Sequence, residues 1–275
     1  MSTFKVLSES ISVNDICEPF IGEFDSSQDA QELSEEWMEI CCEKGLNPME
    51  PIGLVKRNQK IIGWICFEVL ESPKTLYECM DPIIGDILIS SDTPLLEAIH
   101  VICRSNDFIF LVLKGNQFIG FLHYSHFHKL PFRLCLFALL MDLERTMLKI
   151  TKSNPTSFLK NLTKGRLNCA EKIGGLRGLS SNEENKVFDY NLVECTQFID
   201  KFTMLRKNLE IVQKCPNIDS RFNKKAEKIR NSIAHPEGEE SVLLPIKREE
   251  ILPFIKWIEE LQSQLNKYIE IHNLY

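Results

Sequence analysis

One short segment of the chain carries side chains that could cut RNA without a metal ion: Arg230-Asn231-Ser-Ile-Ala-His235-Pro236. An imidazole can take the proton from a ribose 2′-hydroxyl or donate one to the leaving 5′-oxygen. A guanidinium can stabilise the charge that develops on the transferring phosphoryl group, and the amide of Asn231 can orient the imidazole or the phosphate. The pattern therefore predicts a catalytic group of Arg230, Asn231 and His235. The nucleophile belongs to the substrate, which restricts the reaction to RNA.

The geometry of a helix end would bring these side chains together. Asn231 and His235 are four residues apart and share a helix face, with Arg230 one step round from Asn231. Pro236 disfavours helical geometry at His235 and so ends the helix there. One imidazole must serve two proton transfers, so we expect a homodimer in which a second copy supplies a second His and Arg. The basic residues expected to bind the RNA lie upstream: Lys224, Lys225 and Lys228.

The elements around this segment are predicted to be helical. An apolar stripe (Leu134, Phe137, Ala138, Met141, Leu148) begins after Pro131, which suits a first helical position. The spacing further predicts small helices broken by Gly-Gly and Ser-Ser, one long amphipathic helix over 192–214, a helix over 221–236 and a closing helix near 248–270. Strand signals are nearly absent, so we expect residues 131–275 to form an all-α helical bundle. Glu144, Glu227 and Asp219 are interpreted as ion-pair partners on solvated faces.

This motif resembles the active-site motif of the HEPN superfamily. In both, an Arg is followed directly by a polar residue and five positions later by a His, at a helix end late in an all-helical domain. The resemblance covers roughly 131–275 and implies a metal-independent endoribonuclease that works as a dimer, often as a toxin or defence effector. It also implies Arg230, Asn231 and His235 as the active site. Many relatives place a polar or aromatic residue after the His, where this chain has Pro236. The open alternative is structural: the same three residues cap a helix C-terminus in an interaction domain.

The first half of the chain contains an internal repeat. The segment ICEPFIGEFDSSQDA (16–30) recurs 63 positions later as CMDPIIGDILISSDT (79–93), which aligns Ser27 and Asp29 with Ser90 and Asp92. LVKRNQKIIG (54–63) recurs at an offset of 57 as LVLKGNQFIG (111–120). Each copy is predicted to form a strand, a helix with a Ser/Asp/Thr/Pro start, and a hairpin with a tight turn. The sequence therefore predicts a pseudo-symmetric α/β module.

This arrangement resembles a pair of CBS domains over roughly residues 10–130, and it implies adenine nucleotide binding in clefts between the copies. The family signature is a Gly, two apolar residues, a Thr or Ser, two further residues and a ribose-binding Asp. Both Asp positions are lost here, since Gly120 leads to His126 and Gly63 leads to Val69. The remaining candidate nucleotide contacts are Ser90, Thr93 and His126. A CBS-like fold used for dimerisation, or for sensing an atypical ligand, stays an equal alternative.

Charge and composition narrow the class of protein. Residues 1–130 contain 9 Lys and Arg against 20 Asp and Glu, whereas residues 131–275 contain 23 against 19, so only the second half is suited to a polyanion. No apolar run is long enough to cross a bilayer, and the start lacks a secretory pattern. Ten scattered cysteines without a CxxC motif indicate reduced thiols in a cytoplasmic protein. His123, His126 and His128 have no nearby Cys or carboxylate to complete a metal site.

The sequence thus predicts a two-domain α+β protein, with a CBS-like sensor module over 1–130 and a HEPN-like helical domain over 131–275. We expect a homodimeric endoribonuclease that cleaves single-stranded RNA, needs no cofactor or metal, and takes an adenine nucleotide as regulatory ligand. The alternative is a non-catalytic protein that senses an adenine nucleotide or a partner and dimerises through its helices.

Overall fold

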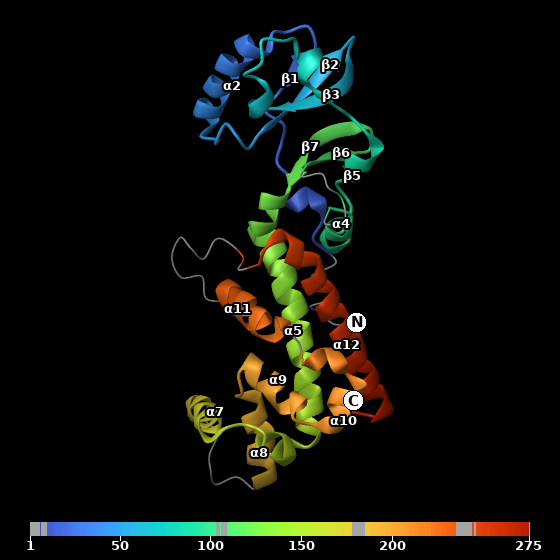
Figure 1. The fold of residues 1–275 in the computed structure, drawn as a ribbon. Coiled ribbons are helices and arrows are strands. Elements are labelled where there is room, and N and C mark those ends of the chain that lie inside the picture. Colours follow the sequence, from blue (N-terminus) through green and yellow to red (C-terminus); the bar gives the residue numbers. More distant parts are fainter. Residues whose placement is uncertain are drawn as a thin grey trace. The chain divides into compact units, whose positions relative to one another are not determined.

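The computed structural model describes residues 6, 10–102, 105, 109–177, 185–219, 221–234, 244 and 246–274. The chain forms two compact units (Figure 1): one is Ile11–Lys129, and the other is Leu130–Tyr275 together with Met1–Ser10. The described strands all belong to the first unit, and the described part of the second is helical, as the sequence predicts for an α+β chain.

The first unit repeats one motif of a strand, a helix and a hairpin. In each copy the first strand runs parallel to the second, which pairs antiparallel with the third. A register shift between Val55 and Lys56 recurs at the equivalent point of the second hairpin, between Val112 and Leu113, so the sequence duplication is also a duplication of backbone geometry. The elements are β1 (Glu23–Asp25), α2 (Ala30–Lys44), β2 (Ile52–Arg57), β3 (Lys60–Cys66), α3 (Leu76–Cys79) and β4 (Asp81–Pro82), then β5 (Leu88–Ser90), α4 (Leu95–Ile102), β6 (Ile109–Lys114) and β7 (Gln117–His123).

The strand-to-helix part of the repeat has a different offset from the sequence alignment. Helix α2 begins at Ala30 and α4 at Leu95, which is farther along the chain than the alignment predicts, so the predicted alignment of Ser27 and Asp29 with Ser90 and Asp92 is wrong. A 3₁₀ turn at Gly85–Ile87 precedes β5 and takes up additional chain. Similar Ser and Asp residues occur at several neighbouring positions in both copies, so the sequence alone allows more than one alignment. The pairing of the strands decides which alignment is correct.

Each copy is completed by a segment of the other. Asp81-Pro82, which opens the second copy, pairs with β3 at Gly63, and Glu18, which opens the first, pairs with β7 at Phe121. A Cβ atom on Gly120 would lie 2.2 Å from the carbonyl oxygen of Glu18, and one on Gly63 would lie 2.7 Å from that of Asp81. Only glycine allows backbones to approach so closely. The repeated acidic-Pro dipeptides therefore lie against the glycines that end the repeated hairpin segments, Gly63 and Gly120.

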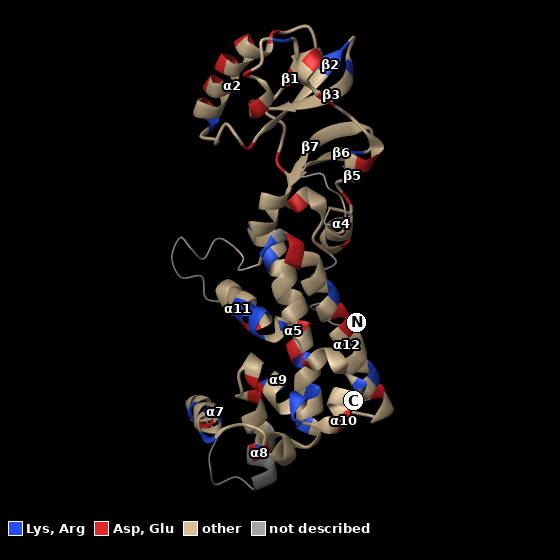
Figure 2. Ribbon diagram, in the orientation of Figure 1, with Lys and Arg blue, Asp and Glu red and all other residues tan. Residues whose placement is uncertain are grey.

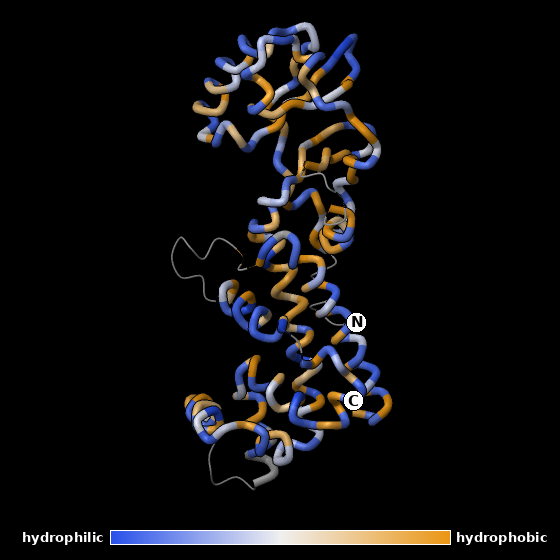
Figure 3. The backbone as a smooth tube through the Cα atoms, in the orientation of Figure 1, coloured by the Kyte–Doolittle hydropathy of each residue, from blue (hydrophilic) through white to orange (hydrophobic). Residues whose placement is uncertain are grey.

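The sequence of helix α2 explains where this helix begins, where it ends and which face it buries. The Asp29 carboxylate accepts hydrogen bonds from the N–H groups of Gln31 and Glu32, and Gly45 ends the helix with φ of 63°. The indole of Trp37 is fully buried between these ends. Figure 3 shows α4 as largely apolar, which agrees with the burial of four of its eight residues. Burial of one helix face against a sheet supplies most of the stability of such a layer.

Helix α5 is the centre of the helical unit and packs against α8, α9, α11 and α12. Trp257 stacks on Phe202 and Phe254, with ring centroids 6.0 and 5.6 Å apart, and joins these elements in one core. In the described part of the chain, no helix has the length and apolar character that a membrane span requires. The helices are α5 (Leu130–Ser153), α6 (Pro155–Leu159), α7 (Lys164–Leu176), α8 (Asn185–Glu194), α9 (Phe198–Arg206), α10 (Leu209–Lys214), α11 (Phe222–Ala234) and α12 (Arg248–Ile271).

Two helix predictions need correction. The long helix expected over 192–214 is three helices, because an Asp200 carboxylate accepts the Gln197 N–H at one break and the Asn208 side chain caps α10 at the other. Such local caps end helices even where the apolar period continues. On α5 the expected stripe is also rotated: Leu134 is 40% exposed, whereas Leu136 is buried.

Candidate functional site

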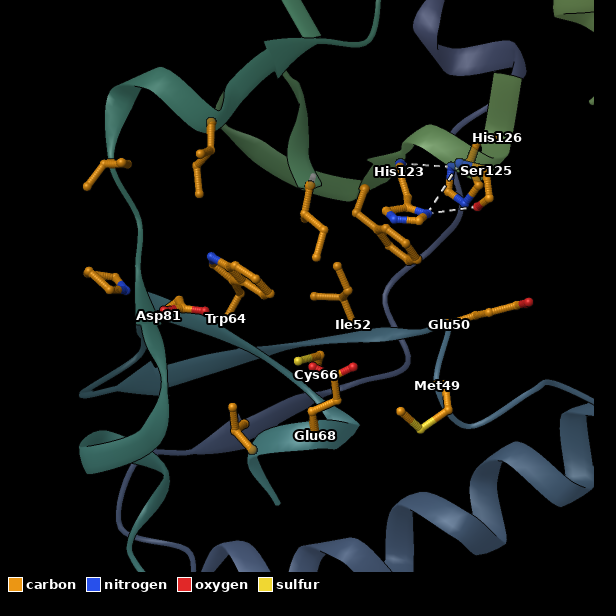
Figure 4. Close-up of a pocket in the computed structure, with 16 residues that line it drawn as sticks. Met49, Glu50, Ile52, Trp64, Cys66, Glu68, Asp81, His123, Ser125 and His126 are labelled. Carbon is orange, nitrogen blue, oxygen red and sulfur yellow. Dashed lines mark hydrogen bonds between the residues drawn. The ribbon is translucent and has the colours of Figure 1, made fainter. Parts of the chain in front are cut away.

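The first unit contains a cavity of about 770 Å³ between its two repeats. Side chains from both sheets line it (Figure 4): Trp64 and Ile52 rise from one sheet, and His123, Ser125 and His126 come from the end of the other. The described lining residues are Met49, Glu50, Ile52, Trp64, Cys66, Glu68, Val69, Asp81, Pro82, Ile84, Ile87, Ile109, Phe121, His123, Ser125 and His126.

Many lining residues occupy equivalent positions in the two copies. Five pairs follow the offset that relates the two hairpins, and they are Ile52 with Ile109, Trp64 with Phe121, Cys66 with His123, Glu68 with Ser125, and Val69 with His126. The apolar and aromatic pairs keep their character, whereas the remaining three do not. The cavity therefore has walls of one backbone geometry but of different chemistry, with a carboxylate on one side and imidazoles on the other.

The second copy supplies a compact polar turn. His126 is 7% exposed, and its Nδ1 accepts a hydrogen bond of 3.2 Å from the His123 backbone N–H. The Nδ1 of His123 lies 2.8 Å from Ser125 Oγ and accepts the Ser125 N–H. Burial, with the positive charge of Lys129, lowers the pKa of His126 to about 3. His126 is therefore an uncharged hydrogen-bonding group at neutral pH.

The two histidines line the same end of the cavity because a turn lies between them. An extended chain would send His123 and His126 to opposite faces. The chain instead leaves β7 at His123 and enters a 3₁₀ turn at Tyr124–His128, which places the two rings 6.2 Å apart.

The first copy supplies an aromatic and acidic wall. The indole Nε1 of Trp64 is shielded from solvent and has no hydrogen-bond partner among the described residues, a condition that costs free energy until an acceptor is present. Asp81 lies directly opposite Trp64 in the pairing of β3 and β4, and burial raises the pKa of its carboxyl group above the ordinary value. Glu68 also lines this side.

The predicted nucleotide contacts are divided by the structure. His126 lines the cavity, whereas Ser90 and Thr93 are not among its described lining residues. They belong instead to the turn before α4, where Ser90 Oγ accepts the Asp92 N–H and the Thr93 carbonyl accepts the Val13 N–H. Sequence reasoning missed Trp64 and Glu68. The hairpin offset relates them to Phe121 and Ser125, which also line the cavity.

The predicted catalytic residues are described only in part. Arg230 and Asn231 lie in the last turns of α11, where Arg230 Nη1 donates to Asn231 Oδ1 at 3.2 Å. His235 and Pro236 lie outside the described residues. Figure 2 shows basic residues along α11. Of the predicted substrate-binding residues, Lys224 and Lys228 are exposed, whereas Lys225 forms an ion pair with Glu250.

A buried ionic network lies beneath Arg230. Its Nη2 is 3.7 Å from Glu144 Oε2, and the other Glu144 oxygen accepts a 3.0 Å hydrogen bond from Lys201. The Lys201 side chain is only 2% exposed and also donates to the Thr196 carbonyl at 2.8 Å. Glu144 is thus an ion-pair partner, as expected, but it is 14% exposed rather than on a solvated face. It connects α5 with both α9 and α11, by a hydrogen bond to Lys201 and by a longer ion-pair contact with Arg230.

No protein-family model and no curated protein matches the chain. Solved structures of CBS domains are similar to its N-terminal part. The CBS domains of a transcriptional regulator from Streptococcus pneumoniae match with 13% identity and a TM-score of 0.32, covering 42% of this chain and 95% of that one. A CBS-domain protein from Thermotoga maritima matches with 18% identity and a TM-score of 0.31, covering 42% and 91%. CBSX2, solved in complex with AMP, matches with 16% identity, the same TM-score and the same coverage.

We expect Glu144→Gln to destabilise the helical unit by about 3–5 kcal/mol, because it leaves the buried Lys201 ammonium without its counter-charge. Adding Lys201→Met should recover part of this loss, since the double variant has no unpaired buried charge. Urea unfolding measures both effects. Glu171→Gln, a matched change on the exposed face of α7, should cost less than about 0.5 kcal/mol. A Glu144→Gln variant as stable as the wild type would contradict this account of the network.

The buried His126 predicts a pH dependence of the stability of the first unit. Its folded pKa is about 3, below an unfolded value of about 6.5. The stabilisation is therefore present above pH 6.5 and is lost as the pH falls toward 3, by at most about 1.4 kcal/mol per pH unit. His126→Asn keeps an acceptor but does not titrate, so its stability should fall less steeply than that of the wild type between about pH 6.5 and 4.

Hydrogen exchange of strand amides in Ile11–Lys129 during urea unfolding measures the stability of this unit. His100→Asn, at a half-buried position of α4, is the matched control and should keep the wild-type slope. Equal slopes for the wild type and His126→Asn would show that His126 does not carry the effect.

Proposed function

We propose that the module formed by Ile11–Lys129 binds a small organic ligand in the cavity between its two repeats and acts as a sensor. The cavity supports this proposal, since its volume of about 770 Å³ falls in the range of small-molecule sites, roughly 300–1,000 Å³. Its walls are mainly apolar and aromatic with a few polar groups, which is the usual composition of such sites. The resemblance to CBS domains makes adenine compounds the first ligands to test.

The aromatic wall is the part of the cavity best suited to a heterocyclic ring. Trp64 and Phe121 occupy equivalent positions of the two copies and lie on the same cavity. An aromatic ring can stack on either one. His126, uncharged and hydrogen-bonded, is placed to contact the other end of the ligand.

We expect adenosine or AMP to bind the full-length chain saturably, as measured by isothermal titration calorimetry. At a ligand concentration of 100 times Kd, binding should stabilise the folded protein by about 2.7 kcal/mol. Trp64→Leu should weaken binding at least about tenfold, because it removes the aromatic stacking surface. Tyr77→Leu removes an exposed aromatic residue that does not line the cavity and should bind like the wild type. Equal binding by Trp64→Leu would place the ligand elsewhere.

We also propose that the helical unit is a metal-independent endoribonuclease that acts on single-stranded RNA as a homodimer. The placement of Arg230 and Asn231 supports this proposal: they are hydrogen-bonded neighbours at the end of a helix whose exposed face carries Lys224 and Lys228. The ion pair with Glu144 orients the guanidinium. His235 directly follows the last residue of α11. The non-catalytic alternative assigns the same residues to a helix end in a dimerisation domain.

We expect the wild type to cleave labelled single-stranded RNA in excess chelator and to leave cyclic 2′,3′-phosphate ends. His235→Ala should lower the rate at least about 100-fold, the usual contribution of a general acid or base, with an unchanged Tm. Lys172→Ala removes an exposed basic residue on α7; it serves as the control for loss of a basic side chain elsewhere and should retain activity. Intact RNA with the wild type, across a panel of adenine compounds, would support the non-catalytic alternative.

A further inference from the structure

We propose that the ligand of the cavity is an organic cation whose charged group lies at Glu68 and Asp81, and not a phosphate-bearing anion. This inference rests on the proposed function of the cavity as a ligand site. It goes further because it assigns the charge of the ligand and the side chains that recognise it.

The Asp, Glu, Lys and Arg residues on the described cavity walls are all acidic. Glu50, Glu68 and Asp81 line it, and no Lys or Arg is found among its described lining residues. None of the three carboxylates takes part in an ion pair within the described part of the chain. Figure 4 shows the Glu68 carboxylate turned toward the cavity and Asp81 beside Trp64, whereas Glu50 points away. Two carboxylates therefore face the ligand without a counter-charge.

The groups around the opposite wall do not offset this negative potential. His126 stays uncharged because burial lowers its pKa to about 3. The nearby cation, Lys129, forms an ion pair with Glu18 and donates to the Ile16 carbonyl at 2.8 Å. A phosphate in the cavity would place its charge near unpaired carboxylates, with no Lys or Arg among the described lining residues to compensate it.

A cation with an apolar body matches the remaining walls. The face of an indole attracts cations more strongly than that of other aromatic side chains, especially where water is excluded. Asp81 and Trp64 are direct partners in the β3–β4 pairing, so a charged group at Asp81 would also lie near the indole. Ile52, Ile87 and Ile109 then provide apolar surface for the body of the ligand.

Three adenosine derivatives with the same body and different charge test the proposal. The first is 5′-amino-5′-deoxyadenosine, which is a cation. The second is adenosine, which is neutral, and the third is AMP, which is an anion. Calorimetry with the full chain at low ionic strength should give at least about tenfold tighter binding of the amine than of AMP, and added salt should reduce this ratio. The titrations are run in chelator and again with Mg²⁺. Tightest binding by AMP under either condition would overturn the inference and leave the proposed sensor function intact.

The acidic wall is tested with matched variants. Glu68→Gln, alone and with Asp81→Asn, should weaken the amine about tenfold and change adenosine binding by less than about twofold, because only the charge interaction is removed. Glu71→Gln removes the same charge from an exposed position that does not line the cavity and should leave all three affinities unchanged. An amine affinity that is insensitive to Glu68 and Asp81 would overturn the assignment. If none of the three compounds binds, the adenine-sensing function fails as well.

Discussion

The close approach of two backbone pairs at Gly63 and Gly120 is the constraint on which the N-terminal module depends. At each glycine the opening segment of one copy lies against the hairpin of the other, at distances that exclude a side chain. Neither sheet is therefore complete without chain from its partner copy. This exchange fixes the two hairpins relative to each other, and it explains why equivalent positions of the two hairpins face one common cavity.

Duplication of the backbone left the side chains free to diverge. The apolar positions of the cavity stay apolar in both copies because both must exclude water from the same interface. The polar positions differ: a thiol and a carboxylate in the first copy correspond to an imidazole and a hydroxyl in the second. A ligand between such walls has a defined orientation, which a strictly symmetric cavity could not impose. Transmission of its binding to the helical unit requires a different affinity for two states of the protein.

The helical unit has a different organising interaction. Glu144 accepts a hydrogen bond from Lys201 of α9 and lies within ion-pair distance of Arg230 of α11. Charges with so little solvent contact are costly to bury and are tolerated only with their partners in place. The environment of the Arg230 guanidinium is therefore formed in part by residues far away in the sequence. The same carboxylate offsets positive charge that α11 would otherwise present alone.

The sequence by itself determined the type and order of the elements. Repeated glycines, acidic-Pro dipeptides and alternating apolar residues are local signals, so they predicted two strand–helix–hairpin copies followed by helices. Local signals also placed Arg230 and Asn231 at the end of a helix, while His235 lies outside the described residues. Only the tertiary structure decided the spacing between the starts of helices α2 and α4 and the burial of Glu144. It also decided which residues line the cavity, including Trp64 and Glu68. Register, burial and ion pairing each depend on groups brought together from distant parts of the chain, and the pattern of any one segment contains no information about its partners.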